Sequence, residues 1–129
     1  MICAGIDAGS RSTKVVLFDT ETGRVLGRGL ANQGMELERL AATYPHVVKS
    51  GRGLGFILGL ELVEKEKIPA FAKSDKTAAL QFVNRLHEAG ALTIPAGTQI
   101  VRLLPPLNLK PQEAGEGISK IEEVIKSVA

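Results

Sequence analysis

The sequence predicts a single α+β domain, with a mixed or mostly antiparallel sheet and about three helices packed on one face. A chain of 129 residues suits one domain with one core. Short β-branched runs between Gly-rich turns alternate with segments of helical periodicity. A hydrophobic content of 44% with balanced charges is typical of a soluble globular protein. The expected element order is βββ-α-ββ-α-ββ-α.

The first third of the chain is expected to form a three-stranded meander. The segments Ile2–Ile6 and Lys14–Asp19 are apolar and β-branched, and a Gly/Ser-rich connection between them is typical of a hairpin. Thr20–Gly23 has the composition of a turn and leads into a third strand, Arg24–Leu30. Because Arg24 and Arg28 interrupt the apolar pattern, at least one face of this sheet is expected to be wet.

A helix and two strands are expected next. Apolar residues in Met35–Ala42 recur at helical spacing, and Tyr44-Pro45 ends the helix because the residue before proline avoids the α region. Val47–Lys49 and Leu54–Val63 are expected to be strands. Glu64–Lys73, which is rich in charge and contains a proline, is expected to be an exposed loop.

A second helix is expected to begin at Ser74 or Asp75 as its N-cap and to end at Gly90, where a left-handed residue is favoured. Its apolar face comprises Ala79, Phe82, Val83 and Leu86. Short strands at Ala91–Ile94 and Gln99–Leu103 follow. Pro111 suits the first turn of a final helix. The apolar face of that helix comprises Ile118, Ile121, Val124, Ile125 and Val128.

Composition excludes several kinds of site and partner. Cys3 is the single cysteine and is expected to be a buried thiol, so no intrachain disulfide or cysteine-rich metal site is expected. His46 and His87 stand alone, which predicts no metal site. The scarcity of aromatic residues argues against nucleic-acid binding, and no apolar run reaches membrane-spanning length. We expect a cytoplasmic protein. We also expect the side chains of Glu122 and Glu123, on the last helix, to be solvated.

A candidate phosphate loop lies between the first two strands and comprises Asp7, Gly9, Ser10, Ser12, Thr13 and Lys14. Small residues, hydroxyls and a cation are what a phosphate cradle requires. Residues 3–34, including Gly5-Ile6-Asp7-Ala8-Gly9-Ser10, resemble the activator ATPases of 2-hydroxyacyl-CoA dehydratases, which belong to the actin-like superfamily. The resemblance implies contacts to nucleotide phosphates, but the second phosphate loop and the adenosine-binding segment of that family do not follow.

Residues 36–129 resemble the C-terminal small domain of class III pyridoxal-phosphate aminotransferases, with acetylornithine aminotransferase as the nearest type. The resemblance is carried by Gly51-Arg52-Gly53-Leu54-Gly55, Leu58-Gly59-Leu60-Glu61-Leu62, Leu92-Thr93-Ile94-Pro95-Ala96-Gly97 and the run from Val101 to Leu109. It implies that Arg102 clamps the α-carboxylate of the substrate, which suits a planar guanidinium. It also implies that the cofactor lysine, the aspartate on the pyridine nitrogen and the phosphate loop belong to the large domain.

Taken together, the two resemblances lead us to expect a recombined or artificial chimera. In this hypothesis residues 1–34 supply a β-meander and residues 35–129 an aminotransferase-like segment, and both share one domain over residues 1–129. We expect no enzymatic activity, cofactor or metal, with Arg102 and the phosphate loop as vestiges, and possible self-association through a sheet edge. Two alternatives stay open: residual ATP or phosphate binding by the Asp7–Lys14 loop, and a fragment of a pyridoxal-phosphate aminotransferase.

Overall fold

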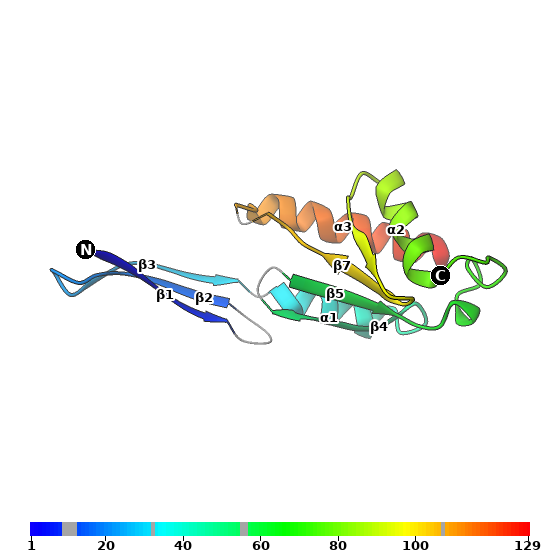
Figure 1. The fold of residues 1–129 in the computed structure, drawn as a ribbon, viewed down its shortest axis with the longest axis horizontal. Helices are drawn as coiled ribbons and strands as arrows, with labels where there is room; N and C mark the ends of the chain where they lie inside the picture. The colour runs from blue at the N-terminus through cyan, green and yellow to red at the C-terminus, as the bar shows by residue number, and fades with distance from the viewer. Residues whose placement is uncertain (9–12, 32, 55–56, 107) are drawn as a thin grey trace.

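The computed structural model describes residues 1–8, 13–31, 33–54, 57–106 and 108–129, which form two sheets and three helices (Figure 1). The first sheet has the order β1-β2-β3, with β1 (Ile2–Ala8), β2 (Thr13–Asp19) and β3 (Arg24–Ala31). The second has the order β4-β5-β7-β6, with β4 (Val48–Leu54), β5 (Ile57–Leu62), β6 (Ile94–Ala96) and β7 (Ile100–Leu103). The helices are α1 (Gln33–Thr43), α2 (Ala78–Glu88) and α3 (Pro111–Val128). Every strand pairing is antiparallel, so the α+β class is confirmed.

The predicted meander forms a sheet of its own, whereas the sequence led us to expect a single sheet. It extends away from the helices as a thin ribbon (Figure 1). Of the described residues, those with a buried side chain all lie at or after position 37. Leu17, Phe18, Val25 and Leu26 are 38% to 52% exposed. Cys3 is exposed as well, so its expected burial is wrong, because no second layer covers this sheet.

The hydrophobic core lies between one face of the four-stranded sheet and the three helices. Along β5, Leu60 and Leu62 are fully buried, while Ile57 is 66% exposed. This alternation follows from the period of two in a strand. The helical side of the core is made of Leu37, Leu40, Phe82, Val83, Leu86, Ile121, Val124 and Ile125. The apolar faces predicted for the three helices therefore meet the sheet as expected.

Helix boundaries follow local chemistry. Helix α1 ends at Thr43, just before Tyr44-Pro45, and Gly90 closes α2 with a φ of +81°. The N-cap of α2 is Thr77, whose hydroxyl accepts a hydrogen bond from the Leu80 amide at 3.2 Å. The expected caps, Ser74 and Asp75, lie two or three residues earlier, where the Ser74 hydroxyl accepts a hydrogen bond from the Lys76 amide at 3.2 Å and does not cap the helix.

The segment from Glu64 to Lys73 is not the exposed loop that its charges suggest. It contains a 3-10 turn at Lys65–Lys67, after which Ile68 and Phe71 are fully buried. The guanidinium carbon of Arg85 lies 5.7 Å from the centre of the Phe71 ring. Ile68 and Phe71 lie three residues apart, and burying their side chains fixes this segment against the core although the residues around them are charged. The segment therefore closes one end of the core.

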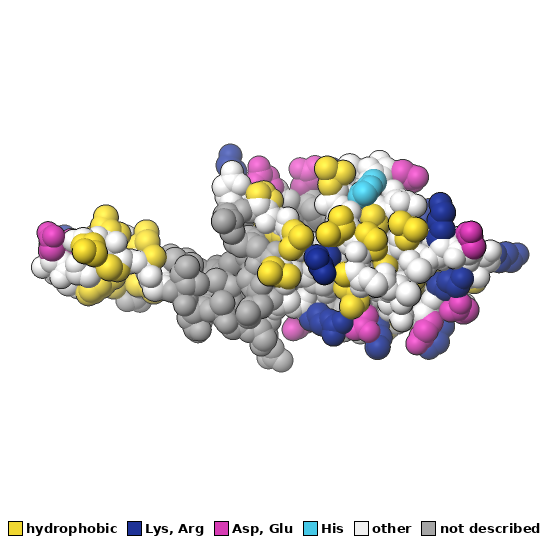
Figure 2. Space-filling view, viewed as in Figure 1, with side chains coloured by type: hydrophobic (Ala, Val, Ile, Leu, Met, Phe, Trp, Pro, Cys, Tyr) yellow, Lys and Arg dark blue, Asp and Glu magenta, His cyan; other side chains and the backbone are white. Residues whose placement is uncertain are grey.

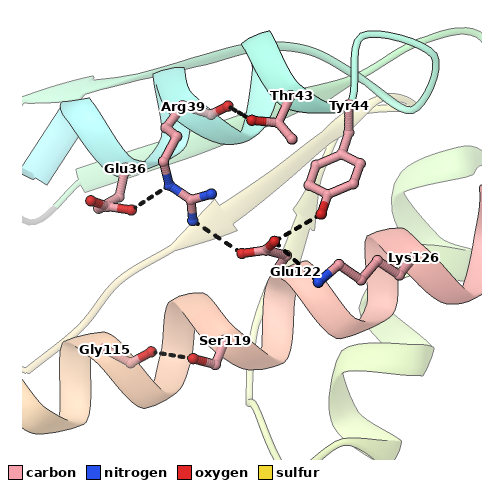
Figure 3. Close-up of polar contacts among 8 residues, drawn as sticks. All are labelled: Glu36, Arg39, Thr43, Tyr44, Gly115, Ser119, Glu122 and Lys126. Carbon is pink, nitrogen blue, oxygen red and sulfur yellow. Dashed lines mark hydrogen bonds and ion pairs between the residues drawn. The ribbon is translucent and has the colours of Figure 1, made fainter.

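A charged network joins α1 to α3 (Figure 3). Glu122 accepts hydrogen bonds from Tyr44 Oη at 2.8 Å and from Arg39 Nη2 at 3.1 Å, and it pairs with Lys126 at 3.2 Å. Arg39 also contacts Glu36 at 2.9 Å. These donors, Tyr44 first, lower the pKa of Glu122 to about 2. Glu122 is therefore a structural bridge and not the solvated residue that the sequence led us to expect.

Candidate functional site

The second face of the four-stranded sheet is open. Because side chains alternate along a strand, Arg102 on β7 and Gly59 on β5 lie on the face opposite to the buried Val101 and Leu60. Helices α1 and α3 pass behind the strands in Figure 1, so the same view in Figure 2 looks onto this open face. Hydrophobic side chains gather there around basic ones (Figure 2). We treat this face as the candidate site.

Arg102 lies on an inner strand of this open face. In the sheet register its Cα lies opposite Gly59 on β5 and opposite Ile94 on β6. The Arg102 side chain is exposed, and within the described part of the chain no hydrogen bond or ion pair engages it. The strand fixes its backbone by pairing on both sides, so the guanidinium is presented from a rigid base.

A second polar group on this face was missed by our sequence reasoning. Glu61 accepts from Lys49 Nζ at 2.8 Å and from Ser50 Oγ at 2.9 Å, while Arg52 Nη2 lies 3.9 Å away. The Lys49 and Ser50 hydrogen bonds lower the pKa of Glu61, and Glu61 in turn raises the pKa of Lys49. In the sequence, this polar group was indicated by Arg52, which stands between Gly51 and Gly53 in a strand.

The residues of the candidate phosphate loop are only partly described. Asp7 on β1 is paired with Lys14 on β2, and Thr13 with Ala8, so these residues lie where the two strands end. Gly9, Ser10 and Ser12 lie outside the described residues. The phosphate-binding role of this loop stays a prediction.

No polar or charged side chain is buried among the described residues. Three or more metal-ligating side chains do not come together anywhere in the described segments. The His87 ring nitrogen Nε2 lies 2.8 Å from the Thr93 carbonyl oxygen. No described helix is both long and apolar enough to cross a membrane.

A separate groove of about 1070 Å³ lies on the helical side of the sheet. It is lined by the N-terminal half of α3, by residues 90–93 and by residues 103–106, with Leu58 among the apolar walls. Arg102 does not line it. The groove and the open sheet face are therefore distinct surfaces.

Comparison with known proteins decides which family this architecture represents. The family model for class-III aminotransferases matches residues 28–125, which include the whole of the four-stranded sheet, α1, α2 and α3 as far as Ile125. The chain belongs to the class III aminotransferase family. Arg102 falls inside the matched segment, on the face of the four-stranded sheet that lies opposite the helices.

Individual relatives agree with this assignment. The acetylornithine aminotransferase of Brucella melitensis biotype 1 is 32% identical to the chain, over 97% of the chain and 28% of the relative. That of a Nostoc species is 35% identical over 71% of the chain and 19% of the relative. The chain thus spans less than a third of the length of these relatives.

Solved structures show the same fold. An amine transaminase from an uncultivated Pseudomonas species superposes with a TM-score of 0.60 at 27% identity, over 75% of this chain and 21% of that one. The acetylornithine aminotransferase of Elizabethkingia anophelis superposes with a TM-score of 0.62 at 23% identity, over 74% of this chain and 22% of the other. The class III aminotransferase fold therefore covers about three-quarters of the chain.

The chimera hypothesis is wrong. One aminotransferase aligns with 97% of the chain, across the boundary that we placed after residue 34, and nothing supports an actin-like ATPase fragment. The expectation that the chain has no enzymatic role is wrong too, since its relatives are aminotransferases. The error has a physical origin. A hairpin with a Gly/Ser connection satisfies general turn chemistry and carries little family information.

Proposed function

We propose that this chain is the part of an acetylornithine aminotransferase-like enzyme that holds the substrate carboxylate. The support comes from relatives named acetylornithine aminotransferase at 32% to 35% identity and from the position of Arg102. The observation that carries the proposal is the exposure of this guanidinium on an inner strand of an uncovered sheet face. A packed interior would bury such a residue against a carboxylate of the same chain.

The chemistry of Arg102 suits this role. A guanidinium donates two parallel hydrogen bonds to a carboxylate and keeps its charge at every physiological pH. In the proposed enzyme a second domain covers the open face and excludes water. The lower local dielectric strengthens the ion pair between Arg102 and the substrate. Because β7 is paired on both sides, the arginine needs little reorganisation to bind.

In this proposal the cofactor site lies on the large domain. Pyridoxal phosphate supplies the electron sink for amino transfer in enzymes that bind it. The described residues of this chain supply a carboxylate clamp and a wall that shields the reaction from water. In support of this division, no charged side chain is buried among the described residues, whereas the cofactor requires an enclosed lysine.

Reconstitution tests the proposal. The chain is mixed with the remaining part of the Brucella melitensis acetylornithine aminotransferase, and the mixture is assayed with pyridoxal phosphate and N-acetylornithine. We expect a one-to-one complex with the absorbance of bound cofactor and measurable amino transfer, neither of which the partner gives alone. A one-to-one complex that carries the cofactor but never turns over the amino donor would contradict the proposal.

A further inference from the structure

A second arginine lies on the same face as Arg102, two strands away. In the register of the sheet Arg52 lies opposite Gly59, and Gly59 lies opposite Arg102. Residues directly opposite each other in antiparallel strands project to the same face. The two arginines therefore stand in one row across β4, β5 and β7, about 10 Å apart at their Cα atoms by the usual strand spacing.

The residue between them has no side chain. A Cβ added to Gly59 would lie 3.9 Å from Arg52 Cγ and 3.4 Å from Ile100 Cγ2. The stem of Arg52 thus lies alongside the glycine, and the space above Gly59 is bounded by aliphatic groups. A side chain at this position would stand between the two guanidinium groups.

Neither guanidinium makes a close polar contact within the described residues. The Arg52 side chain is 61% exposed, and its contact with Glu61 is a long 3.9 Å, whereas Lys49 and Ser50 already satisfy Glu61 at 2.8 and 2.9 Å. Arg102 is exposed and has no polar partner among the described residues. Glu61, the carboxylate next to Arg52, is held more closely by Lys49 and Ser50, so the two guanidinium groups on this face favour an anionic ligand between them.

We propose that Arg52 and Arg102 form a two-arginine oxyanion site over Gly59, which takes a carboxylate or phosphate group of a small molecule. The site rests on the proposed function for the role of Arg102 and adds Arg52 as a second donor. Each guanidinium offers parallel N–H groups to one oxyanion. Ile57 and Ile94, which are 66% and 47% exposed, give this face an apolar border.

Binding to the chain alone tests the site. The ¹⁵N-labelled chain is titrated with acetate and with inorganic phosphate at an ionic strength of about 0.1 M, where the Debye length is about 10 Å, and the Gly59 amide is followed by NMR. We expect saturable binding that shifts this amide. Arg52→Gln and Arg102→Gln should each weaken it about tenfold, the loss of one charge-assisted interaction. Tighter binding of acetate would identify a carboxylate ligand, and tighter binding of phosphate would identify a phosphate ester.

Two controls separate a site from general charge attraction. Arg24→Gln removes the same charge from the meander and should leave the affinity within about twofold, because exposed charges beyond a Debye length are screened. Gly59→Val keeps the charge but fills the gap, so it should abolish the shift. Gly59→Ala, which meets only ordinary contacts, should weaken binding by a smaller factor.

The outcomes are distinct. Equal losses in Arg24→Gln and Arg52→Gln, or no saturable shift with either anion, would overturn the two-arginine site. A loss confined to Arg102→Gln would overturn the part given to Arg52. Because the assay needs no cofactor and no large domain, failure of the reconstitution leaves this test intact. If the chain shows no saturable anion binding but the reconstitution succeeds, the two-arginine site is disproved and the proposed function stands.

Discussion

At the residue scale, Glu122 holds α1 and α3 together through Tyr44, Arg39 and Lys126. Its folded pKa of about 2 lies below the ordinary value of 4.5. A carboxylate with a depressed pKa contributes stability that is fully present above its unfolded pKa and is lost as pH falls through the folded value. The bridge should therefore weaken between about pH 4.5 and pH 2.

The substitution Glu122→Gln should lower the free energy of unfolding at neutral pH, and its difference from the parent chain should shrink as the pH falls below 4.5. Urea unfolding at pH 7, 4 and 3 measures this. Glu123→Gln, at the exposed neighbour on the same helix, provides the matched control. A difference between parent and Glu122→Gln that stays constant from pH 7 to pH 3 would contradict the bridge.

At the element scale, α1 packs unusually close to β4. A Cβ added to Gly51 would lie 2.6 Å from the carbonyl carbon of Leu37 and 2.8 Å from its oxygen. These are backbone atoms of a helix, so they cannot move aside independently. A glycine is required at this position by the helix that crosses it.

The pair Gly51→Ala and Gly59→Ala tests this packing. Gly51→Ala should destabilise the chain by roughly 1 to 3 kcal/mol or more, because the helix must shift away from the strand. In Gly59→Ala the new Cβ meets nothing closer than 3.4 Å, so stability should change little. Chemical unfolding of the three proteins compares them. Equal stability of the two variants would show that α1 does not pack closely on β4.

Elements were predictable where one local rule governs them. Pro45 ends α1, Gly90 closes α2 and Pro111 opens α3, as their chemistry dictates. The burial of the segment around Ile68 and Phe71 was not predictable, because its many charged residues indicate an exposed loop. Only the folded core shows that these two side chains are fully buried. Arg52 escaped notice for a related reason: its closeness to Arg102 depends on strand register, which composition does not reveal.

At the scale of the whole molecule, the meander contributes no buried side chain among the described residues. Deleting residues 1–31 should therefore leave a cooperative unfolding transition with a free energy within about 0.5 kcal/mol of the parent. Thermal and urea unfolding of both chains check this. Loss of the transition on deletion would show that the meander supports the core.

Self-association through a sheet edge also stays a prediction at this scale. β1 and β3 are the outer strands of the meander, and their free backbone groups are suited to pairing with a second chain. Light scattering of the full chain at increasing concentration should show a rise in mass that the chain lacking residues 1–31 does not show. An equal rise for both would place the contact elsewhere.

The role of Arg102 is the central claim, and a kinetic comparison in the reconstituted enzyme tests it most directly. Arg102→Gln should reduce kcat/KM for N-acetylornithine about a hundredfold, since a desolvated substrate carboxylate loses its paired charge. Arg24→Gln should leave kcat/KM within about twofold, because this exposed charge lies on the meander. Equal kcat/KM values for the two variants would contradict the assignment of the open sheet face to substrate binding.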